Sequence, residues 1–345
     1  MRIAEEQAMD LSEDLLKARG APSQHAALQA RVLIDAELKG HPSHGLQRLP
    51  RLLRRIGRGV ADPETTGKPI WRAEGILEVD GRRGLGPVVA MHTLSQLDER
   101  RTKTGIALAA IRNSNHLGML AFYVEEAARR GAIAIALSTS EALVHPYGGT
   151  RAMLGTNPIA IAVPTAGRPF VLDLATSTVS MGKIHHHAST GKPIPEGWAR
   201  DAEGRATTDA EAAKAGSLAP FGDAKGYGLG LAIELLVAAL AGSALSPDVR
   251  GTLDSEHVCN KGDVFILVDP VRSPDMAKRL SAYLDAIRSS PPAEPGSPVQ
   301  VPGDGADHRR ARSRLDGFEI DDRLWAELNA LSTPSHSALI EGRVQ

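Results

Sequence analysis

The segment IALAAIRNSNHLGMLAFYVEEAARRGAIAIALS, residues 106–138, shows the clearest secondary-structure pattern in the chain. Its two ends, 106–111 and 132–138, are short apolar runs bounded by polar or glycine residues, which is typical of buried strands. The longer piece between them, 117–130, predicts a helix that ends before Gly131. A strand, a helix and another strand in this order predict an α/β structure.

The same alternation continues on both sides of this segment. Patterns of hydrophobic residues and turn residues predict the following further elements: strands at 76–80, 158–163, 169–173 and 264–268, and helices at 87–101 and 229–240. The stretch 185–224 is polar and glycine-rich and carries few periodic signals. We expect a mixed α/β domain over residues 76–299.

The two ends of the chain are helical instead. Helices are predicted at 10–19 and 23–39, each followed by a glycine, and a third contains Leu49, Leu52, Leu53 and Ile56. Because a proline inside a helix clashes with the preceding turn, this third helix either begins at about Leu49 or begins near Ser43 and bends at Pro50. Residues 289–306 read as a proline-rich linker or loop, and 321–331 as a helix that returns to the N-terminal ones. We therefore expect a helical domain made of residues 1–75 and 300–345.

Composition limits the classes of protein to consider. The 345 residues exceed the roughly 250–300 at which one core stops growing, which favours two lobes. A net charge of −1 gives no basic face for nucleic acid. A single cysteine, Cys259, and an acidic N-terminus without a signal-peptide pattern favour a cytoplasmic protein. The apolar run 229–242 is shorter than the roughly 20 residues of a membrane span, so we expect a buried core helix and no membrane association.

The first candidate for chemistry is Ser43-His44-Gly45 followed by Arg48. Histidine exchanges protons near neutral pH, and the planar fork of arginine matches a carboxylate. If 44–48 is helical, His44 and Arg48 lie on one face. The pair suits a 2-hydroxy or 2-keto acid, whose carboxylate adjoins the reacting oxygen; the alternative is a capped surface loop.

The second candidate is Asn113-Ser114-Asn115-His116-Leu117-Gly118, between a predicted strand and a predicted helix. Sites gather at strand ends, and a helix N-terminus attracts anions such as a pyrophosphate. His116 could accept a proton there. The alternative is an Asn/Ser-rich turn that caps the helix.

Small residues in three further loops could admit a bulky ligand. They occur at 155–158, at 173–183 and at 222–228, where Lys225 could meet a phosphate. None of these loops is a Walker loop, and none is a G-x-G-x-x-G that follows a strand, so a Rossmann site is not supported. Turn formation alone is the alternative for each.

Two histidine- and arginine-rich runs offer weaker signals. Consecutive histidines at 185–187 do not converge on one ion, and no carboxylate or cysteine stands beside them at ligand spacing, so we expect no metal site. With His41 and His44 they leave a metal-dependent hydrolase as the alternative from another class. The basic run 308–314 could neutralise a cofactor phosphate or form a solvated face.

Six motifs in order resemble the malate/L-lactate dehydrogenase family, the second and non-Rossmann class of such enzymes. They are HPSHGLQRLP, RNSNHLG, LGTNPIAIAVP, LDLATSTVSMGK, IPEGWARDAEG and PFGDAKGYGL, between residues 41 and 229. The resemblance covers roughly residues 5–270 and returns at Pro302-Gly303-Asp304. The family includes sulfolactate, ureidoglycolate and diketogulonate dehydrogenases and cyclic-imine carboxylate reductases.

The resemblance implies a homodimer in which a helical lobe from both chain ends adjoins a larger, mostly antiparallel sheet lobe that binds NAD or NADP. It makes His116 and His44 the acid/base candidates, Ser43 the partner of His44, and Arg48 the clamp for the substrate carboxylate. It assigns the cofactor to His116, Gly118, Leu120, Thr156, Asp173, Leu174, Ala175, Ala224, Lys225, Gly303, Asp304 and Gly305. The chain departs from many relatives at Asp223 and Ala224.

The predicted function is hydride transfer between NAD, or alternatively NADP, and C2 of a small 2-hydroxy or 2-keto acid of the malate, lactate or sulfolactate type. Within the family, the alternative is reduction of a cyclic imine carboxylate. A further alternative is a relative that binds nucleotide without turnover, against which the retained His44, His116 and Arg48 argue.

Overall fold

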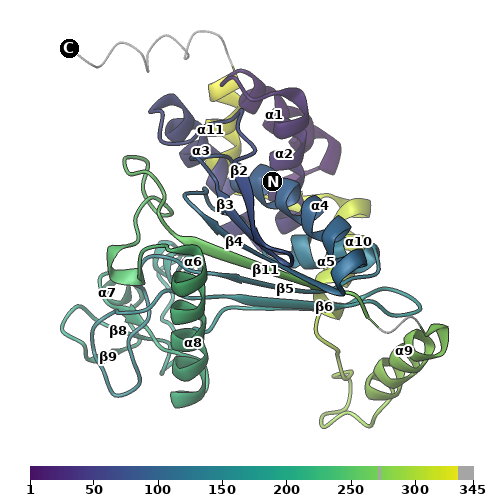
Figure 1. Ribbon diagram of the computed structural model, residues 1–345. Helices are drawn as coiled ribbons and strands as arrows, with labels where there is room; N and C mark the ends of the chain where they lie inside the picture. The colour runs from purple at the N-terminus through teal and green to yellow at the C-terminus, as the bar shows by residue number, and fades with distance from the viewer. Residues whose placement is uncertain (271–272, 333–345) are drawn as a thin grey trace.

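A seven-stranded sheet runs through the centre of the computed structural model, which describes residues 1–270 and 273–332 (Figure 1). Its strands are β2 (Lys68–Ala73), β3 (Ile76–Asp80), β4 (Ile106–Arg112), β5 (Ile133–Ser138), β6 (Ile159–Val163), β7 (Phe170–Leu174) and β11 (Gly262–Val268). They lie in the order β2-β3-β4-β11-β5-β6-β7. The β3–β4 pair is parallel and the other neighbours are antiparallel. The prediction of a mixed, mostly antiparallel sheet without a Rossmann arrangement is confirmed.

The central strand β11 is covered on both faces, which explains its continuous apolar sequence. Phe265 and Leu267 pack with helices α4 (Gly86–Thr104) and α5 (Ala121–Arg129) above the sheet. Val264 points the other way, against helix α8 (Ala224–Ala241) below it (Figure 1). The alternation of side chains along a strand thus divides one apolar run between two cores.

The helical lobe is built from both ends of the chain, as predicted. It contains α1 (Glu5–Lys17), α2 (Ser23–Leu38), α3 (Leu49–Gly57) and α11 (Asp322–Ser332), and β1 (Arg2–Ile3) pairs with β12 (Phe318–Glu319). N-terminal leucines pack with Trp325 and Leu328 in one core. Helix α3 begins at Leu49, so Pro50 lies in its first turn, where proline is tolerated. β2 lies before residue 76 yet pairs with β3; the boundaries at 75/76 and 299/300 stay predictions.

A smaller unit follows β7, in the stretch where few elements were predicted. It contains α6 (Met181–Ser189), β8 (Ala199–Arg200), β9 (Ala206–Thr207), α7 (Ala210–Lys214) and β10 (Ser217–Leu218). Ile184, Ala213 and Leu218 belong to its separate core. The three strands and α7 are only two to five residues long, too short to give a periodic sequence pattern; α6, nine residues long, was not predicted either.

The prediction that the apolar run 229–242 is a buried core helix is wrong in one respect. α8 is 18 residues long, and by length and composition alone it could cross a membrane, but it packs on the sheet with a third of its residues buried. Leu235 and Leu236 are 55% and 42% exposed. The helix is therefore apolar on both faces, and the sheet covers only one.

Two helices in the C-terminal third were not predicted. They are α9 (Pro274–Arg288), which projects from the body (Figure 1), and α10 (Asp304–Asp316), which lies beside α2. The predicted proline-rich loop connects them. The highly charged sequence of α10 lacks an apolar stripe, which is why the sequence did not indicate it.

Candidate active site

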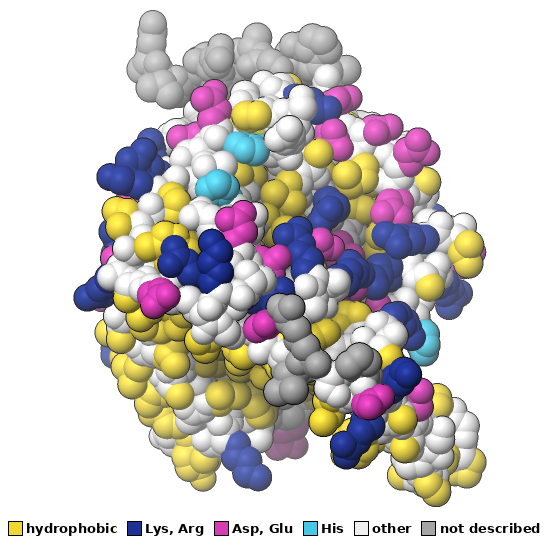
Figure 2. Space-filling view, turned by 45° about the vertical axis from the view of Figure 1, so that its right-hand side comes forward, with side chains coloured by type: hydrophobic (Ala, Val, Ile, Leu, Met, Phe, Trp, Pro, Cys, Tyr) yellow, Lys and Arg dark blue, Asp and Glu magenta, His cyan; other side chains and the backbone are white. Residues whose placement is uncertain are grey.

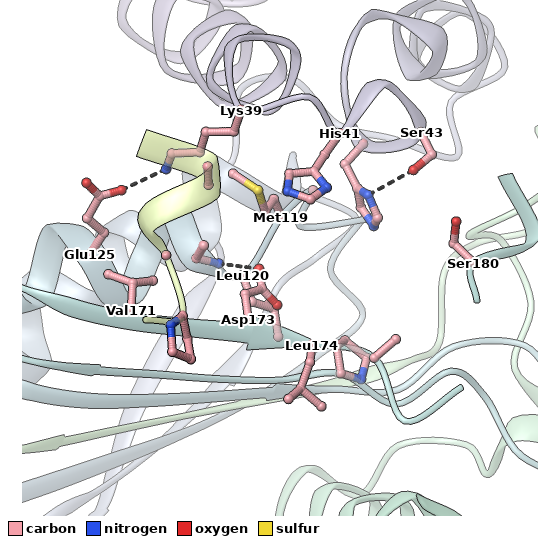
Figure 3. A pocket seen from close by; sticks show the side chains of 18 of the residues that line it. Lys39, His41, Ser43, Met119, Leu120, Glu125, Val171, Asp173, Leu174 and Ser180 are labelled. Carbon is pink, nitrogen blue, oxygen red and sulfur yellow. Dashed lines mark hydrogen bonds and ion pairs between the residues drawn. The ribbon is translucent and has the colours of Figure 1, made fainter. Parts of the chain in front are cut away.

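A cavity of about 680 Å³ lies between the helical lobe and the sheet. Figure 3 shows Lys39, His41 and Ser43 reaching it from the helical side, and Asp173 and Leu174 from β7 opposite. Its volume is within the roughly 300–1,000 Å³ typical of ligand sites. The cavity is large enough for a cofactor together with a small substrate.

Two histidines stack at one end of this cavity. His44 ends a short 3-10 turn (Pro42–His44), and His116 lies in the loop between β4 and α5. Their ring centroids are 5.8 Å apart at an interplanar angle of 26°. Desolvation by the surrounding protein lowers the pKa of His44 to about 3 and holds the pKa of His116 well below its ordinary value; the Arg48 charge adds to both effects. Both rings are therefore neutral at physiological pH.

The hydrogen bonds of the two rings differ. The backbone N–H of Gly118 donates to Nδ1 of His116 at 3.0 Å, so the neutral ring carries its proton on Nε2. Nδ1 of His44 lies 3.2 Å from the Ser43 hydroxyl oxygen. If that nitrogen donates to Ser43, Nε2 of His44 has a free lone pair.

Arg48 places a cation beside the histidines. Its Nε donates to the Ser43 carbonyl at 2.7 Å, and among the described residues it has no carboxylate within ion-pair distance. The carboxylate of Glu141 also lines the cavity, but it accepts from the backbone N–H groups of Thr252 and Leu253, at 2.8 and 3.0 Å. Desolvation lowers the pKa of Arg48 to about 10, which leaves it charged at neutral pH. An anion from solution could satisfy it.

The opposite end of the cavity is formed by the start of α10. Gly303 has φ +97°, and a Cβ there would lie 2.9 Å from the Val171 carbonyl, so the close approach needs glycine. Asp304 forms two 2.9 Å hydrogen bonds with the Arg288 guanidinium, which fix this turn. A helix N-terminus favours phosphate groups. The start of α10 could therefore receive an anionic group of a ligand bound in the cavity.

Asp173 lies in the wall between the two ends. Its carboxylate accepts from the Ala121 N–H at 2.7 Å, which joins β7 to the start of α5. The exposed surface of the Asp173 side chain faces the cavity. Desolvation by the surrounding protein raises the pKa of its carboxyl to about 6. A polar ligand in the cavity would therefore meet a hydrogen-bonding group there.

Comparison with known proteins gives a consistent result over nearly the whole chain. The family model described as malate/L-lactate dehydrogenase matches residues 3–329. A dehydrogenase structure from Sinorhizobium meliloti is 58% identical, with a TM-score of 0.94 over 96% of this chain and 98% of that one. The (2R)-3-sulfolactate dehydrogenase (NADP(+)) of Chromohalobacter salexigens is 38% identical, over 95% of this chain and 97% of its own. The Δ(1)-pyrroline-2-carboxylate reductase of Ancylobacter novellus is 34% identical, over 93% and 94% respectively.

The chain belongs to the malate/L-lactate dehydrogenase family. The predicted family is confirmed, and with it the prediction of an NAD(P)-dependent oxidoreductase that acts on small 2-hydroxy acids.

Most site residues predicted from the resemblance to malate/L-lactate dehydrogenases come together in this cavity. They are Ser43, His44, Arg48, His116, Gly118, Leu120, Thr156, Asp173, Leu174, Ala175, Gly303, Asp304 and Gly305. Ala224 and Lys225 do not line it; they begin α8. Their cofactor role stays a prediction.

Several lining residues were missed or considered only for another role. Lys39 is 3% exposed and lies 2.7 Å from both Asp35 and Glu125, and Figure 3 shows its contact with Glu125 at the cavity edge. Arg309 lies against Gly40 and donates to the Lys39 carbonyl at 2.7 Å. Lysine is common at a helix C-terminus, where its charge interacts favourably with the helix dipole. The sequence therefore gave no reason to assign Lys39 to a site.

The remaining sequence candidates lie elsewhere. The histidines 185–187 are on α6, where His187 contacts the Pro193 carbonyl and the Trp198 ring. The described part of the chain holds no group of three or more His, Cys, Asp or Glu side chains placed to bind a metal. Cys259 is buried, which raises its thiol pKa to about 11 and makes it a poor nucleophile.

Proposed function

We propose that this enzyme interconverts a 2-hydroxy acid of the malate, lactate or sulfolactate type and its 2-keto acid, with NAD as cofactor and NADP as the alternative. The observation that carries the proposal is the Arg48 cation without an ion-pair partner among the described residues, directly beside two neutral histidines. A carboxylate on Arg48 would place the neighbouring C2 oxygen near the histidines. The NADP-dependent relative keeps both cofactors open.

The side chains can be given separate roles in this reaction. Arg48 binds the substrate carboxylate in a forked geometry. His44, with Nδ1 directed to Ser43, takes the hydroxyl proton on Nε2, while His116 donates from Nε2 to the same oxygen. The nicotinamide, when bound, exchanges the hydride with C2. The low pKa of both rings keeps them uncharged before the reaction, which leaves a lone pair on His44 and a neutral N–H donor on His116.

The wall of the cavity would hold the cofactor along its length. Gly118, Leu120, Thr156 and residues 173–175 would pack around it, and the start of α10, residues 303–305, would meet its diphosphate. Ala224 and Lys225 could contribute only from outside this cavity. Their placement at the N-terminus of α8 would suit a contact made in an assembly of two chains.

We also propose a cytoplasmic homodimer. In Figure 2, hydrophobic side chains gather over the lower left, on the side where Figure 1 places α8. Leu229, Leu235 and Leu236 on this helix are 36% to 55% exposed. Contiguous exposed apolar side chains mark an association surface more often than a solvated one. A second copy that covers α8 would bury them.

Reduction of a cyclic imine carboxylate is a second candidate, favoured by the similarity to the Ancylobacter novellus reductase. Such a substrate also carries a carboxylate for Arg48, and its C=N bond would take the place of C=O.

Absorbance at 340 nm tests the proposal directly. Purified protein with NADH or NADPH would be offered pyruvate, oxaloacetate, sulfopyruvate, diketogulonate and a cyclic imine carboxylate. Rapid oxidation with a keto acid would support the main proposal, and activity with the imine alone would support the second. No oxidation of NADH or NADPH with any of these substrates, together with no NADH binding by fluorescence, would overturn both proposed reactions.

A further inference from the structure

A second, smaller cavity of about 40 Å³ adjoins the histidine end of the large one. The two share Arg48, His116, Gly118 and Thr252 in their walls. The rest of the small cavity is lined by Gln29, Leu33, Arg51, Leu52, Arg55, Asn115 and Gly251. One water-sized group needs roughly 10–15 Å³ of such a cavity, so about three of them fit. A carboxylate, with one carbon and two oxygens, is about this size.

The lining of the small cavity is cationic. It includes three arginines, Arg48, Arg51 and Arg55, and no aspartate or glutamate. Arg55 is already occupied, because its Nε donates to the Asn115 side chain at 3.0 Å and its Nη1 to the carbonyls of Asp254 and His257. Its guanidinium therefore holds the protein together and has little left for a ligand.

Arg51 is in a different position. It is half-buried, and it makes no hydrogen bond or ion pair with any residue in 1–270 or 273–332. Besides desolvation, its charge contributes to the lowered pKa values of Arg48 and His116, so its guanidinium lies within electrostatic reach of both. The histidine end thus carries two arginines without an ion-pair partner among the described residues; the nearby Glu141 carboxylate, which acts electrostatically on Arg48, accepts hydrogen bonds from the backbone N–H groups of Thr252 and Leu253.

These two arginines are neighbours on the same helical segment. Arg48 directly precedes α3 with helical backbone angles, and Arg51 stands three residues later, so they lie about one turn apart. A four-carbon dicarboxylate or a three-carbon sulfonate carries its two anionic groups close enough to meet both. A monocarboxylate would neutralise one arginine and leave the other facing it.

We propose that Arg51 receives a second anionic group on C3 of the substrate, so that the site selects dianionic 2-keto and 2-hydroxy acids over monocarboxylates. The proposal rests on the proposed function, since it assumes that Arg48 binds the C1 carboxylate. It assigns Arg51 to specificity and leaves proton transfer to the histidines.

The test compares the kcat/KM of oxaloacetate and sulfopyruvate with that of pyruvate in wild type, Arg51→Gln, Arg51→Lys and Arg54→Gln. Arg54 is on the same helix but pairs with Glu327 at 3.6 Å and does not line either cavity, which makes it a matched control. A hydrogen bond to a charged group contributes about 1.5–3 kcal/mol, so the dianion-to-pyruvate ratio should fall about 10- to 100-fold in Arg51→Gln. Arg51→Lys should retain part of the ratio, and Arg54→Gln all of it.

The outcomes separate this inference from the proposed function. A wild type that prefers pyruvate, or an Arg51→Gln variant that loses pyruvate and oxaloacetate activity equally, would overturn the role of Arg51 alone. A wild type that reduces no keto acid would overturn the proposed function, and the substrate class with it. A melting temperature for Arg51→Gln close to that of wild type would exclude misfolding as the cause of any loss.

Discussion

The two histidines at this end of the cavity differ in the role of Nε2, which carries a proton in His116 and a lone pair in His44 when Nδ1 of His44 donates to Ser43, and this difference has measurable consequences. Replacing either His44 or His116 by Ala should lower kcat by about 10²- to 10⁴-fold, the usual contribution of acid/base catalysis. His116→Gln should lose less than His44→Gln, because the glutamine amide can still donate but cannot act as a base. Steady-state kinetics would check this. The control is His92→Ala, which replaces an exposed histidine on α4 and should leave kcat unchanged. A His44/His116 double variant with near-full activity would contradict the mechanism.

Arg48 should act on substrate binding more than on the chemical step. Arg48→Lys keeps the charge but replaces a planar fork by a point charge, so KM for the keto acid should rise about 10-fold or more with a smaller change in kcat. NADH binding, followed by fluorescence, should change little. An unchanged KM would show that the carboxylate binds elsewhere.

Glu37 is a buried carboxyl that supports the loop of His44 and Arg48. Its Oε1 accepts from the Leu46 N–H at 2.7 Å, and burial raises its pKa from 4.5 to about 7. The folded protein therefore holds this proton at a pH where the unfolded chain has lost it, so its contribution to stability falls as pH rises from about 4.5 to 7.

Glu37→Gln should remove that pH dependence while it keeps a carbonyl oxygen for Leu46. At 1.36 kcal/mol per pKa unit, the wild type should lose on the order of 3 kcal/mol between pH 4 and 8 from this group alone. Urea unfolding at both pH values would measure the difference, with Glu6→Gln at an exposed position as the control. Equal pH dependence in wild type and Glu37→Gln would show that Glu37 is charged in the fold.

At the scale of elements, the exposed apolar face of α8 predicts how two chains associate. Leu235→Glu with Leu236→Glu should convert a dimer to a monomer, because two charges would be buried without partners in the interface. Light scattering after gel filtration would show the mass. Leu315→Glu on α10, where the leucine is 86% exposed, is the matched control. A dimer unaffected by the double change, or a monomeric wild type, would contradict the proposal.

The elements that the sequence predicted well share a physical cause. Strands β4 and β5 lie within one residue of the expected ranges, because short apolar runs between turn residues define both ends. Helix α5 begins four residues later than expected, since the segment 117–120 is held in the loop of His116. Helix α10 is highly charged and has no apolar stripe, so no pattern indicated it. Helix α9 does carry apolar residues at helical spacing, among them Met276, Leu280 and Leu284, so its pattern was present in the sequence and was missed.

At the scale of the whole molecule, local sequence patterns predicted many of the helices, strands and motif residues, but not which of them lie side by side in the folded chain. His44, His116 and Arg48 were indicated by motifs, whereas Arg51 and Lys39 read as ordinary helix residues. The candidate roles of these two residues depend on what surrounds them after folding. Arg51 lines the small cavity without a hydrogen-bond partner among the described residues, and Lys39 pairs with Glu125. The insertion of β11 between β4 and β5 is equally invisible in the sequence, because strand pairing at long range has no local signature.

The position of β11 also bears on how the chain folds during synthesis. β11 pairs Gly262 with Arg112 and Asp263 with Ser138, so it is the last strand made of the seven and the one that joins the two halves of the sheet. Until it leaves the ribosome, β4 and β5 both have an unpaired edge, and such edges are prone to aggregate. Contacts so distant along the chain also slow folding. A nascent chain stalled before residue 262 should therefore be a substrate for chaperones, and release of the next few residues should complete the sheet in a single late step.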